Sequence, residues 1–269
     1  MHPFIHVVWR DIPAYGLCMV IAGFVMWPII LLLTKKRRPD LPDVSTVYLI
    51  GVCGALIGAL SLRPIMKMVE VAVKWDYYST ITAGALFRYV FGEMVFYGGL
   101  IGGLAAVFIY CRNYKIKTVD MLDSFAPAIA LGHAIGRMGC FFGGCCYGME
   151  VPHDHPLAIV YPPASLGAPP GVPLLAVPLI EAAFLFLLFV TLSITYLKTK
   201  KRAICISLYL TLYSVERFIL EFYRGDLIRG RYGFLTTSQY ISIAAFIFGV
   251  LIFALAGRRQ KRETPDIIE

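Results

Sequence analysis

The chain has 269 residues, of which 58% are hydrophobic, and its mean hydropathy is +0.71. Ordinary soluble domains are nearer about 45–50% apolar, so this composition excludes them and indicates a membrane protein. The formal net charge of +8 comes from short basic clusters between apolar stretches, which is typical of cytoplasmic loops and argues against nucleic-acid binding.

Seven apolar stretches predict membrane-spanning helices, since each approaches the roughly 20 residues that cross the hydrocarbon core. They cover residues 15–33, 48–66, 95–110, 121–142, 174–197, 203–223 and 240–256. We therefore predict an all-α, polytopic membrane protein with a single integral-membrane domain over residues 1–257.

The basic clusters predict the orientation of these helices. They follow the first, third, fifth and seventh stretches, as Lys35, Lys36, Arg37 and Arg38, then Arg112, Lys115 and Lys117, then Lys198, Lys200, Lys201 and Arg202, and finally Arg258, Arg259, Lys261 and Arg262. Because they fall on alternate connections, the positive-inside rule places them all in the cytoplasm. The N-terminus is then outside, and residues 258–269 form a basic cytoplasmic tail.

Three connections face outward in this arrangement, at residues 69–94, 149–172 and 224–238. The first is amphipathic and suits the membrane interface. The second is rich in proline and glycine and predicts an exposed loop.

Glycines mark the second and third predicted spans. Residues 98–103 contain two overlapping Gly-xxx-Gly pairs, and Gly54 and Gly58 repeat the spacing. Such pairs let two helices approach closely in lipid, so close helix packing is the simplest interpretation. Gly98 and Gly99 could also let a ligand approach the backbone.

Arg137 lies in the stretch at residues 136–148, which continues an apolar run without a break. An arginine at the centre of a membrane costs about 2.5–3.5 kcal/mol on insertion scales, so a retained one is a candidate for binding a substrate, ion or partner charge. Arg137 is therefore our first candidate functional residue.

The sixth predicted span carries the strongest polar stripe. Tyr213, Arg217, Glu221 and Arg224 are spaced so that they share one helix face. Arg217 and Glu221 can pair, and one interpretation of the stripe is a purely structural ion pair between helices. The other is an anion site shared with Arg137, because guanidinium groups suit phosphate oxygens.

Histidines and cysteines offer weaker candidates. His133 shares a helix face with Arg137 but is more simply a hydrogen-bonded packing residue. Cys140, Cys145 and Cys146 could bind a soft metal together with His133, although one outward-facing disulfide or three packed thiols is simpler in the absence of a C-x-x-C pair. We accordingly expect no metal and no cofactor.

Several blocks resemble, in order, those of the prolipoprotein diacylglyceryl transferase family. The Gly-Arg-x-Gly block at 136–139 and the Arg-Phe-x-x-Glu-Phe-x-Arg block at 217–224 are the most specific. The others are Tyr15-Gly16, the block from Tyr97 to Gly102, Pro178-Leu179-Ile180-Glu181, Asp226 and Gln239. The resemblance covers nearly the whole chain, and seven spans with the N-terminus outside agree with it.

This resemblance implies a multi-pass enzyme of the bacterial inner membrane. Such an enzyme transfers the diacylglyceryl group of phosphatidylglycerol to the lipobox cysteine in the signal peptide of a prolipoprotein. A thioether forms and glycerol phosphate leaves. The alternative is a divergent paralogue that keeps the lipid site but acts on another acceptor, or a lipid-binding or transport protein without this chemistry.

The resemblance also implies roles for individual residues. Arg137 and Arg217 would clamp the phosphate, Glu221 is a further catalytic candidate, and Tyr97 occupies the position of a proposed base. Substrate-binding residues would be Tyr15, Gly98, Gly99, Gly139, Gly148, Tyr213 and Arg224.

The chain departs from the family at the positions expected to activate the thiol. The position of Tyr97 is usually histidine, and imidazole accepts protons at neutral pH better than a phenol. Cys140 and Cys145 stand where the family commonly has asparagine and glutamate. These departures predict a divergent branch that keeps the phosphate clamp.

Overall fold

The computed structural model describes residues 4–7, 10–41, 43–91, 95–199, 201–226 and 231–263. Most of them are helical. The chain divides into two compact units, the first formed by Met1–Pro39 with Leu122–Glu269 and the second by Asp40–Met121.

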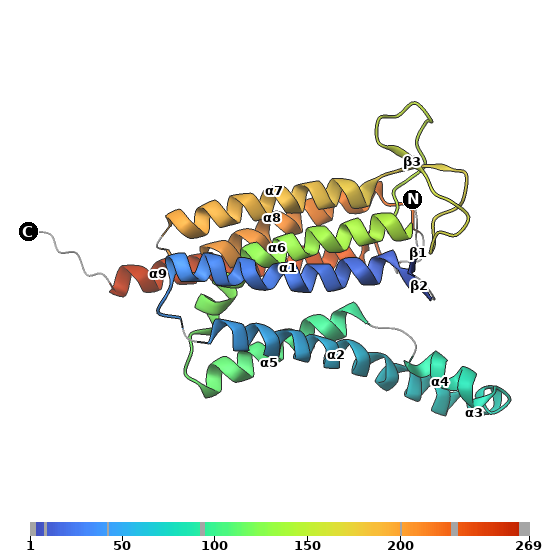
Figure 1. Ribbon diagram of the computed structural model, residues 1–269, viewed down its shortest axis with the longest axis horizontal. Helices are drawn as coiled ribbons and strands as arrows, with labels where there is room; N and C mark the ends of the chain where they lie inside the picture. Colours follow the sequence, from blue (N-terminus) through green and yellow to red (C-terminus); the bar gives the residue numbers. More distant parts are fainter. Residues whose placement is uncertain are drawn as a thin grey trace, which may run out of the picture. The chain divides into compact units, whose positions relative to one another are not determined.

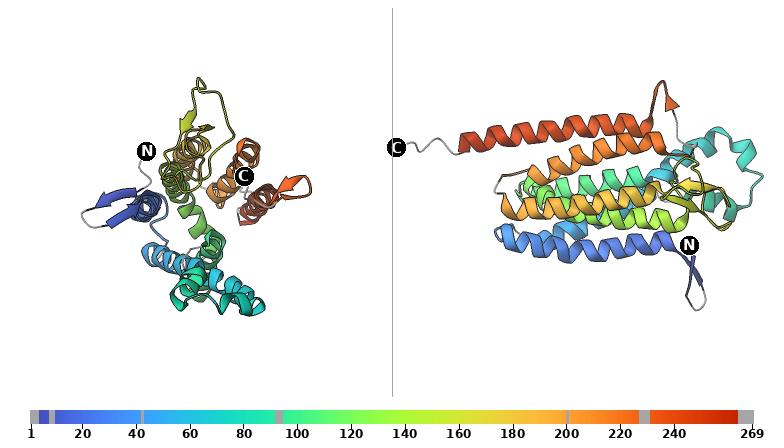
Figure 2. Two further views of the ribbon diagram at one scale, coloured as in Figure 1. Left: turned by 90° about the vertical axis from the view of Figure 1, so that its right-hand side faces the viewer. Right: turned by 90° about the horizontal axis from the view of Figure 1, so that it is seen from above.

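Long helices with aligned axes build the first unit. These are α1 (Ala14–Arg37), most of α6 (Thr118–Gly143), α7 (Val177–Lys198), α8 (Ile204–Leu220), which continues into the 3-10 turn η1 (Glu221–Tyr223), and α9 (Thr237–Glu263). Their directions alternate, so α6 and α8 end where α1, α7 and α9 begin (Figures 1 and 2). We call this the site end, and the opposite end the basic end.

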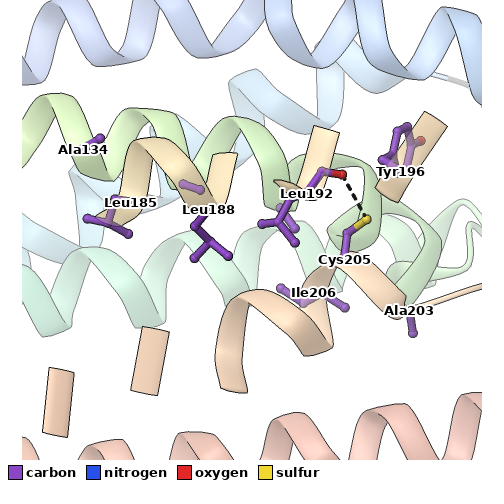
Figure 3. Close-up of a cluster of buried hydrophobic side chains, with 10 residues drawn as sticks. Ala134, Leu185, Leu188, Leu192, Tyr196, Ala203, Cys205 and Ile206 are labelled. Atoms are coloured by element: carbon purple, nitrogen blue, oxygen red, sulfur yellow. Dashed lines mark hydrogen bonds between the residues drawn. The ribbon is translucent and has the colours of Figure 1, made fainter. Parts of the chain in front are cut away.

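The core of the first unit lies between α6, α7 and α8. Leu185, Leu188 and Leu192 repeat at helical spacing along α7 and are almost fully buried. Alanines of α6, among them Ala134, belong to the same cluster, and so does Ile206 of α8 (Figure 3). This packing fixes the three helices that carry the polar residues at the site end.

Buried polar contacts organise the basic end. Asp123 of α6 accepts hydrogen bonds from the backbone N–H groups of Cys205 and Ile206, at 2.7 and 3.1 Å, and so satisfies the first turn of α8. Arg37 lies 3.5 Å from Asp123 and donates to the backbone oxygen of Lys201 at 2.9 Å. The basic clusters at 35–38 and 198–202 therefore meet at one end, as their alternation predicts; Lys200 itself lies outside the described residues.

The second unit contains α2 (Val44–Val73), α3 (Trp75–Tyr78), α4 (Ala83–Phe91) and α5 (Phe96–Asn113). Backbones of α2 and α5 touch at the glycines: a Cβ on Gly58 would meet the backbone of Gly98 and Gly102, and one on Gly54 would meet Ala106. The predicted glycine-mediated packing of these two helices is confirmed.

The predicted outward connection at 69–94 is itself largely helical. Its first residues complete α2, and α4 folds back along that helix. Tyr89 of α4 receives a hydrogen bond from Lys67 at 2.8 Å and donates one to Glu70 at 3.1 Å, while Tyr78 donates to Tyr89 at 2.9 Å. Residues 92–94 lie outside the described part of the chain.

The structure is mostly helical and consistent with the all-α prediction, and three short antiparallel hairpins add to it. They pair β1 (Phe4–Val7) with β2 (Arg10–Pro13), β3 (Ala158–Val160) with β4 (Pro173–Leu175), and β5 (Arg231–Tyr232) with β6 (Leu235–Thr236). The connection at 149–172 is also more than an exposed loop. Tyr161 and Ala168 within it form a small buried cluster with Leu174 of β4, and burial raises the pKa of Tyr161 to about 12.

Helix lengths support a polytopic membrane protein. Within the described residues, α1, α2, α6, α7 and α9 are long and apolar enough to cross a membrane, and α4 with α5 adds a sixth span if the bent pair counts as one. The sequence predicts a seventh where α8 has 17 helical residues before η1. Helix α9 extends to Glu263, so the predicted tail begins as helix, and 264–269 lie outside the described residues.

Candidate functional site

Arg137 and Glu181 form the centre of a buried polar cluster at the site end. Arg137 lies on the last two turns of α6 and Glu181 on the first turns of α7. Nη2 of Arg137 is 2.9 Å from Oε1 of Glu181, whose side chain is fully buried. The ion pair explains how a carboxylate is tolerated inside an apolar helix.

Arg217 approaches the same carboxylate from α8. Its Nη1 is 3.9 Å from Oε2 of Glu181, and its Nη2 is 2.9 Å from Oε2 of Glu221, one turn further along. Glu221 also accepts a hydrogen bond from the Thr236 hydroxyl at 2.9 Å. The pairing of Arg217 with Glu221 that the spacing predicts is confirmed. We refer to Arg137, Glu181, Arg217 and Glu221 as the arginine–glutamate cluster.

Tyr213 and His133 line one side of this cluster. Tyr213 donates a hydrogen bond to Oε1 of Glu181 at 3.2 Å. The ring of His133 packs edge-on against Tyr213, with centroids 4.8 Å apart, and its Nδ1 lies 3.2 Å from the Tyr209 hydroxyl. His133 is thus the hydrogen-bonded packing residue that the sequence suggests.

Each of the two central arginines has an unused hydrogen-bond donor. Nε of Arg137 is buried and makes no hydrogen bond within the described part of the chain, and Nη1 of Arg217, 3.9 Å from Oε2 of Glu181, also makes none there. Buried donors in native proteins nearly always have an acceptor, so these two mark a place for one. The acceptor chemistry that suits converging guanidinium groups is a carboxylate or a phosphate.

The sequence-based candidate set omitted two acidic residues at this cluster. Glu181 forms ion pairs with both arginines. In the sequence analysis it appears only as the last residue of a family block, not as a site residue. Glu216 precedes Arg217 on α8, and both of its carboxylate oxygens are buried without a hydrogen-bond partner among the described residues. The signal available in the sequence was an acidic residue inside an apolar helix, which is uncommon in membrane spans.

Beyond α6, the chain turns sharply and pairs with two other segments, one around Arg224 and one around Leu175. Gly144 adopts a φ of +68°, and a Cβ there would clash with Ser165. Gly148 pairs with Arg224 in an isolated β-bridge, and its N–H donates to the backbone oxygen of Leu175 at 2.9 Å. A Cβ on Gly148 would lie 2.7 Å from Leu175, so close packing by itself requires glycine here.

Arg224 anchors the same junction through its side chain. It is bidentate to Asp226, with Nε 2.8 Å from Oδ1 and Nη2 2.6 Å from Oδ2. The guanidinium also interacts with the thiol of Cys146. Hydrogen bonds from Cys140 and Cys145, followed by the charge of Arg224, lower the pKa of Cys146.

Cys140, Cys145 and Cys146 form a compact group, which we call the thiol cluster. Their three sulfur atoms lie within 4.8 Å of one another. All seven cysteines fall within the described residues, and none of them forms a disulfide there. Of the two simpler interpretations, a disulfide and three packed thiols, the structure therefore shows the second.

The remaining predicted site residues divide between the two units. In the first, Tyr15 on the first turn of α1 packs against Gly139 and interacts electrostatically with Arg137 and the thiol cluster. In the second, Tyr97 lies on the first turn of α5 and is 46% exposed, and Gly98 and Gly99 pack against α2. The structure brings Tyr15, Arg137, Gly139, Gly148, Tyr213, Arg217, Glu221 and Arg224 to the site end of the first unit.

These features define a polytopic membrane protein with a buried arginine–glutamate cluster suited to an anionic group. The family model for prolipoprotein diacylglyceryl transferase matches residues 4–255. The chain belongs to this family.

Relatives from three bacteria support the assignment. The chain is 32% identical over 241 residues to the phosphatidylglycerol–prolipoprotein diacylglyceryl transferase of Clostridium tetani, covering 89% of this chain and 92% of that protein. It is 36% identical over 181 residues to phosphatidylglycerol–prolipoprotein diacylglyceryl transferase 2 of Clostridium perfringens, covering 67% and 69%. Identity to the Finegoldia magna transferase is 30% over 243 residues, covering 90% of each.

Proposed function

We propose that this chain transfers the diacylglyceryl group of phosphatidylglycerol to the lipobox cysteine thiol of prolipoproteins, the first step of lipoprotein maturation. Family membership over nearly the whole chain supports the reaction. The structural observation that carries the proposal is that Arg137 and Arg217, from different helices, converge on the single carboxylate of Glu181.

The reaction needs positive charge where the leaving group departs. The acceptor sulfur forms a bond to the glycerol carbon, the bond from that carbon to the phosphate oxygen breaks, and the electron pair leaves with glycerol phosphate. The phosphate gains charge as the bond breaks. Nε of Arg137 and Nη1 of Arg217 would donate to its oxygens, and such donors stabilise a transition state best when they are already in place.

Glu181 would position these donors. It holds one nitrogen of Arg137 at 2.9 Å and receives the Tyr213 hydroxyl at 3.2 Å, while Glu221 holds Arg217 at 2.9 Å. Fixing both guanidinium groups before the lipid arrives lowers the reorganisation required during the reaction. The carboxylates also offset the cost of burying two arginines in the membrane.

The orientation of the chain follows from the charge at its two ends. Arg37 and Lys201 meet at the basic end, which the positive-inside rule assigns to the cytoplasm. The arginine–glutamate cluster lies at the other end, and this would place it near the outer leaflet. We propose seven spans with the N-terminus outside, in the bacterial inner membrane, where secreted prolipoproteins present their signal peptides.

Tyr97 remains our candidate for a proton acceptor at the family's histidine position. Tyr15, Gly98, Gly99, Gly139, Gly148, Tyr213 and Arg224 remain candidate substrate-binding residues. Close packing already accounts for Gly98, Gly139 and Gly148, so their contribution to binding would come through backbone geometry.

Complementation tests the function directly. A strain depleted of its own transferase would receive this chain, and the mass of a reporter lipoprotein would be measured. We expect a mass increase equal to one diacylglyceryl group on the lipobox cysteine. Growth or lipid binding without that mass increase would contradict the proposal and favour the paralogue that acts on another acceptor.

A further inference from the structure

The thiol cluster has no role in the reaction as proposed so far. Cys140 occupies the last turns of α6 and is buried, whereas Cys145 and Cys146 follow the turn at Gly144 and are partly exposed. Cys146 adopts a φ of +62°, a conformation that non-glycine residues rarely take. Such backbone geometry persists only where surrounding contacts impose it.

Backbone hydrogen bonds hold the turn that carries these thiols. The N–H of Cys145 donates to the oxygen of Cys140 at 3.1 Å. Flanking bonds join Leu166 to Gly143, Ala168 to Gly144, Gly148 to Leu175 and Met149 to Tyr223, at 2.8–2.9 Å. A loop tied on both sides presents its side chains in one arrangement, as a preorganised metal site requires.

The spacing of the sulfur atoms matches metal coordination. Zinc binds thiolate sulfur at about 2.3 Å, so two sulfurs in a tetrahedral zinc site lie about 3.8 Å apart. The three sulfurs here lie within 4.8 Å of one another, which is close to this spacing. Soft thiolate ligands favour zinc over hard cations such as magnesium or calcium.

We propose that Cys140, Cys145 and Cys146 bind one zinc ion, whose fourth coordination position takes the thiol of the acceptor protein. Three protein ligands with one open position is the arrangement of catalytic rather than structural zinc sites. The zinc site stands on the geometry of the cluster alone, whereas the role of the fourth position rests on the proposed function.

The charges around the cluster suit this assignment. Three thiolates around a divalent zinc carry a net negative charge. Arg224 interacts with Cys146, and Arg137 interacts with Cys140 and Cys146. Cys140 follows Arg137 by three residues on α6, and residues at this spacing are neighbours on a helix surface. The metal would therefore lie beside the arginines that are proposed to hold the phosphate.

In this chain, the residues that the family usually has at the thiol-activating positions are replaced. Coordination to the metal would activate the acceptor thiol in their place. On binding the metal, the acceptor thiol releases its proton to water and becomes a thiolate. Its sulfur then forms the bond to the glycerol carbon while the bond to the phosphate oxygen breaks. Zinc keeps its oxidation state throughout, and the thioether product, a weaker ligand, leaves the metal.

Cobalt binding tests the metal site without any turnover. The full-length chain, purified in detergent and reduced, would be titrated with Co²⁺, whose thiolate charge-transfer and d–d absorption report tetrahedral sulfur coordination. We expect one equivalent, displaced by Zn²⁺. Cys140→Ser, Cys145→Ser and Cys146→Ser should each weaken Co²⁺ binding by more than about tenfold, since even the loss of an outer-shell partner costs that much. Cys53→Ser, at an exposed thiol of the second unit, is the matched control.

Three outcomes would overturn the zinc site. One is the absence of stoichiometric Co²⁺ binding by wild-type chain that elutes as a single species. The second is Co²⁺ binding by all three serine variants that is as tight as binding by the wild-type chain, with each variant keeping the wild-type melting temperature. The third is a disulfide between two of the three cysteines in protein alkylated within intact membranes before reduction, detected by peptide mass.

A peptide that carries the lipobox cysteine tests whether the acceptor thiol binds the metal, independently of whether the metal site exists. Added to the Co²⁺-loaded chain without phosphatidylglycerol, it should change the charge-transfer band, whereas the same peptide with serine should not. If the cysteine peptide leaves the charge-transfer band of the bound Co²⁺ unchanged, the acceptor role is overturned, but the zinc site is not. Failure of the proposed function would instead appear as a missing thioether in the complementation assay, whatever the metal content.

Discussion

Arg137 and Arg217 reach opposite oxygens of one buried carboxylate. Nη2 of Arg137 is 2.9 Å from Oε1 of Glu181, and Nη1 of Arg217 is 3.9 Å from Oε2. The two arginines are 80 positions apart in sequence and lie on different helices. Their convergence makes a single anion site physically reasonable, because one negative group placed beside Glu181 would face donors from both.

Replacing either arginine should remove most of the activity. Arg137→Ala or Arg217→Ala takes away a donor to the leaving phosphate, and loss of one such donor typically lowers kcat by about 10²–10³-fold. Arg137→Lys should restore little, because an ammonium group cannot hold Glu181 and a phosphate in the planar geometry of a guanidinium. The measurement is thioether product formed per unit of membrane-inserted enzyme.

Arg112→Ala is the matched control for these variants. Arg112 lies in the last turn of α5 and is exposed, so its removal should leave product formation close to wild type. Wild-type activity in Arg137→Ala would show that this guanidinium does not serve the reaction.

Glu181→Gln should weaken both stability and activity. The amide keeps the volume and can accept the Tyr213 hydrogen bond, but it leaves Arg137 and Arg217 without their shared counter-charge. Breaking a buried ion pair by removing one partner typically costs about 3–5 kcal/mol. We expect a lower melting temperature in detergent, and phosphatidylglycerol should recover part of the difference by supplying the missing negative charge.

Tyr213→Phe provides a smaller perturbation of the same carboxylate. It removes one hydrogen bond to a charged carboxylate and should cost about 1.5–3 kcal/mol, less than Glu181→Gln. Equal melting temperatures for wild type and Glu181→Gln would contradict the organising role of Glu181.

Tyr97→His should preserve or raise activity if this position serves proton transfer, since imidazole accepts protons at neutral pH better than a phenol. The rate of thioether formation at fixed lipid concentration is the measurement, with Tyr114→His, an exposed tyrosine just beyond α5, as the control. A sharp fall in rate for Tyr97→His alone would mean that the phenol has a role of its own.

Gly148→Ala should destabilise the junction between the loop after α6 and the start of α7. The added Cβ would lie 2.7 Å from Leu175 and from Val177, and overpacking of this kind typically costs about 1–3 kcal/mol. Gly167→Ala is the control, because a Cβ added there would have no atom within 4 Å. Comparable melting temperatures for the two variants would show that the junction relaxes without cost.

Hydropathy and spacing predicted much of the helical architecture. The apolar stretches locate α1, α2, α6, α7 and α9, and the spacing of Gly54, Gly58, Gly98 and Gly102 predicts the close contact between α2 and α5. The hairpins could not be predicted, because strands of two to four residues are too short to show an alternating pattern. The buried cluster around Tyr161 was missed because proline and glycine dominate its loop.

The sequence by itself determined that this is a polytopic membrane protein, that Arg217 and Glu221 share a helix face on which they can pair, and which family blocks it carries, because hydropathy, helical spacing and short motifs are local properties. Only the tertiary structure decided that Glu181 joins Arg137 to Arg217 and that three cysteines gather their sulfur atoms beside Arg224. Those contacts connect different helices and loops, and helix packing and backbone turns fix them rather than sequence spacing.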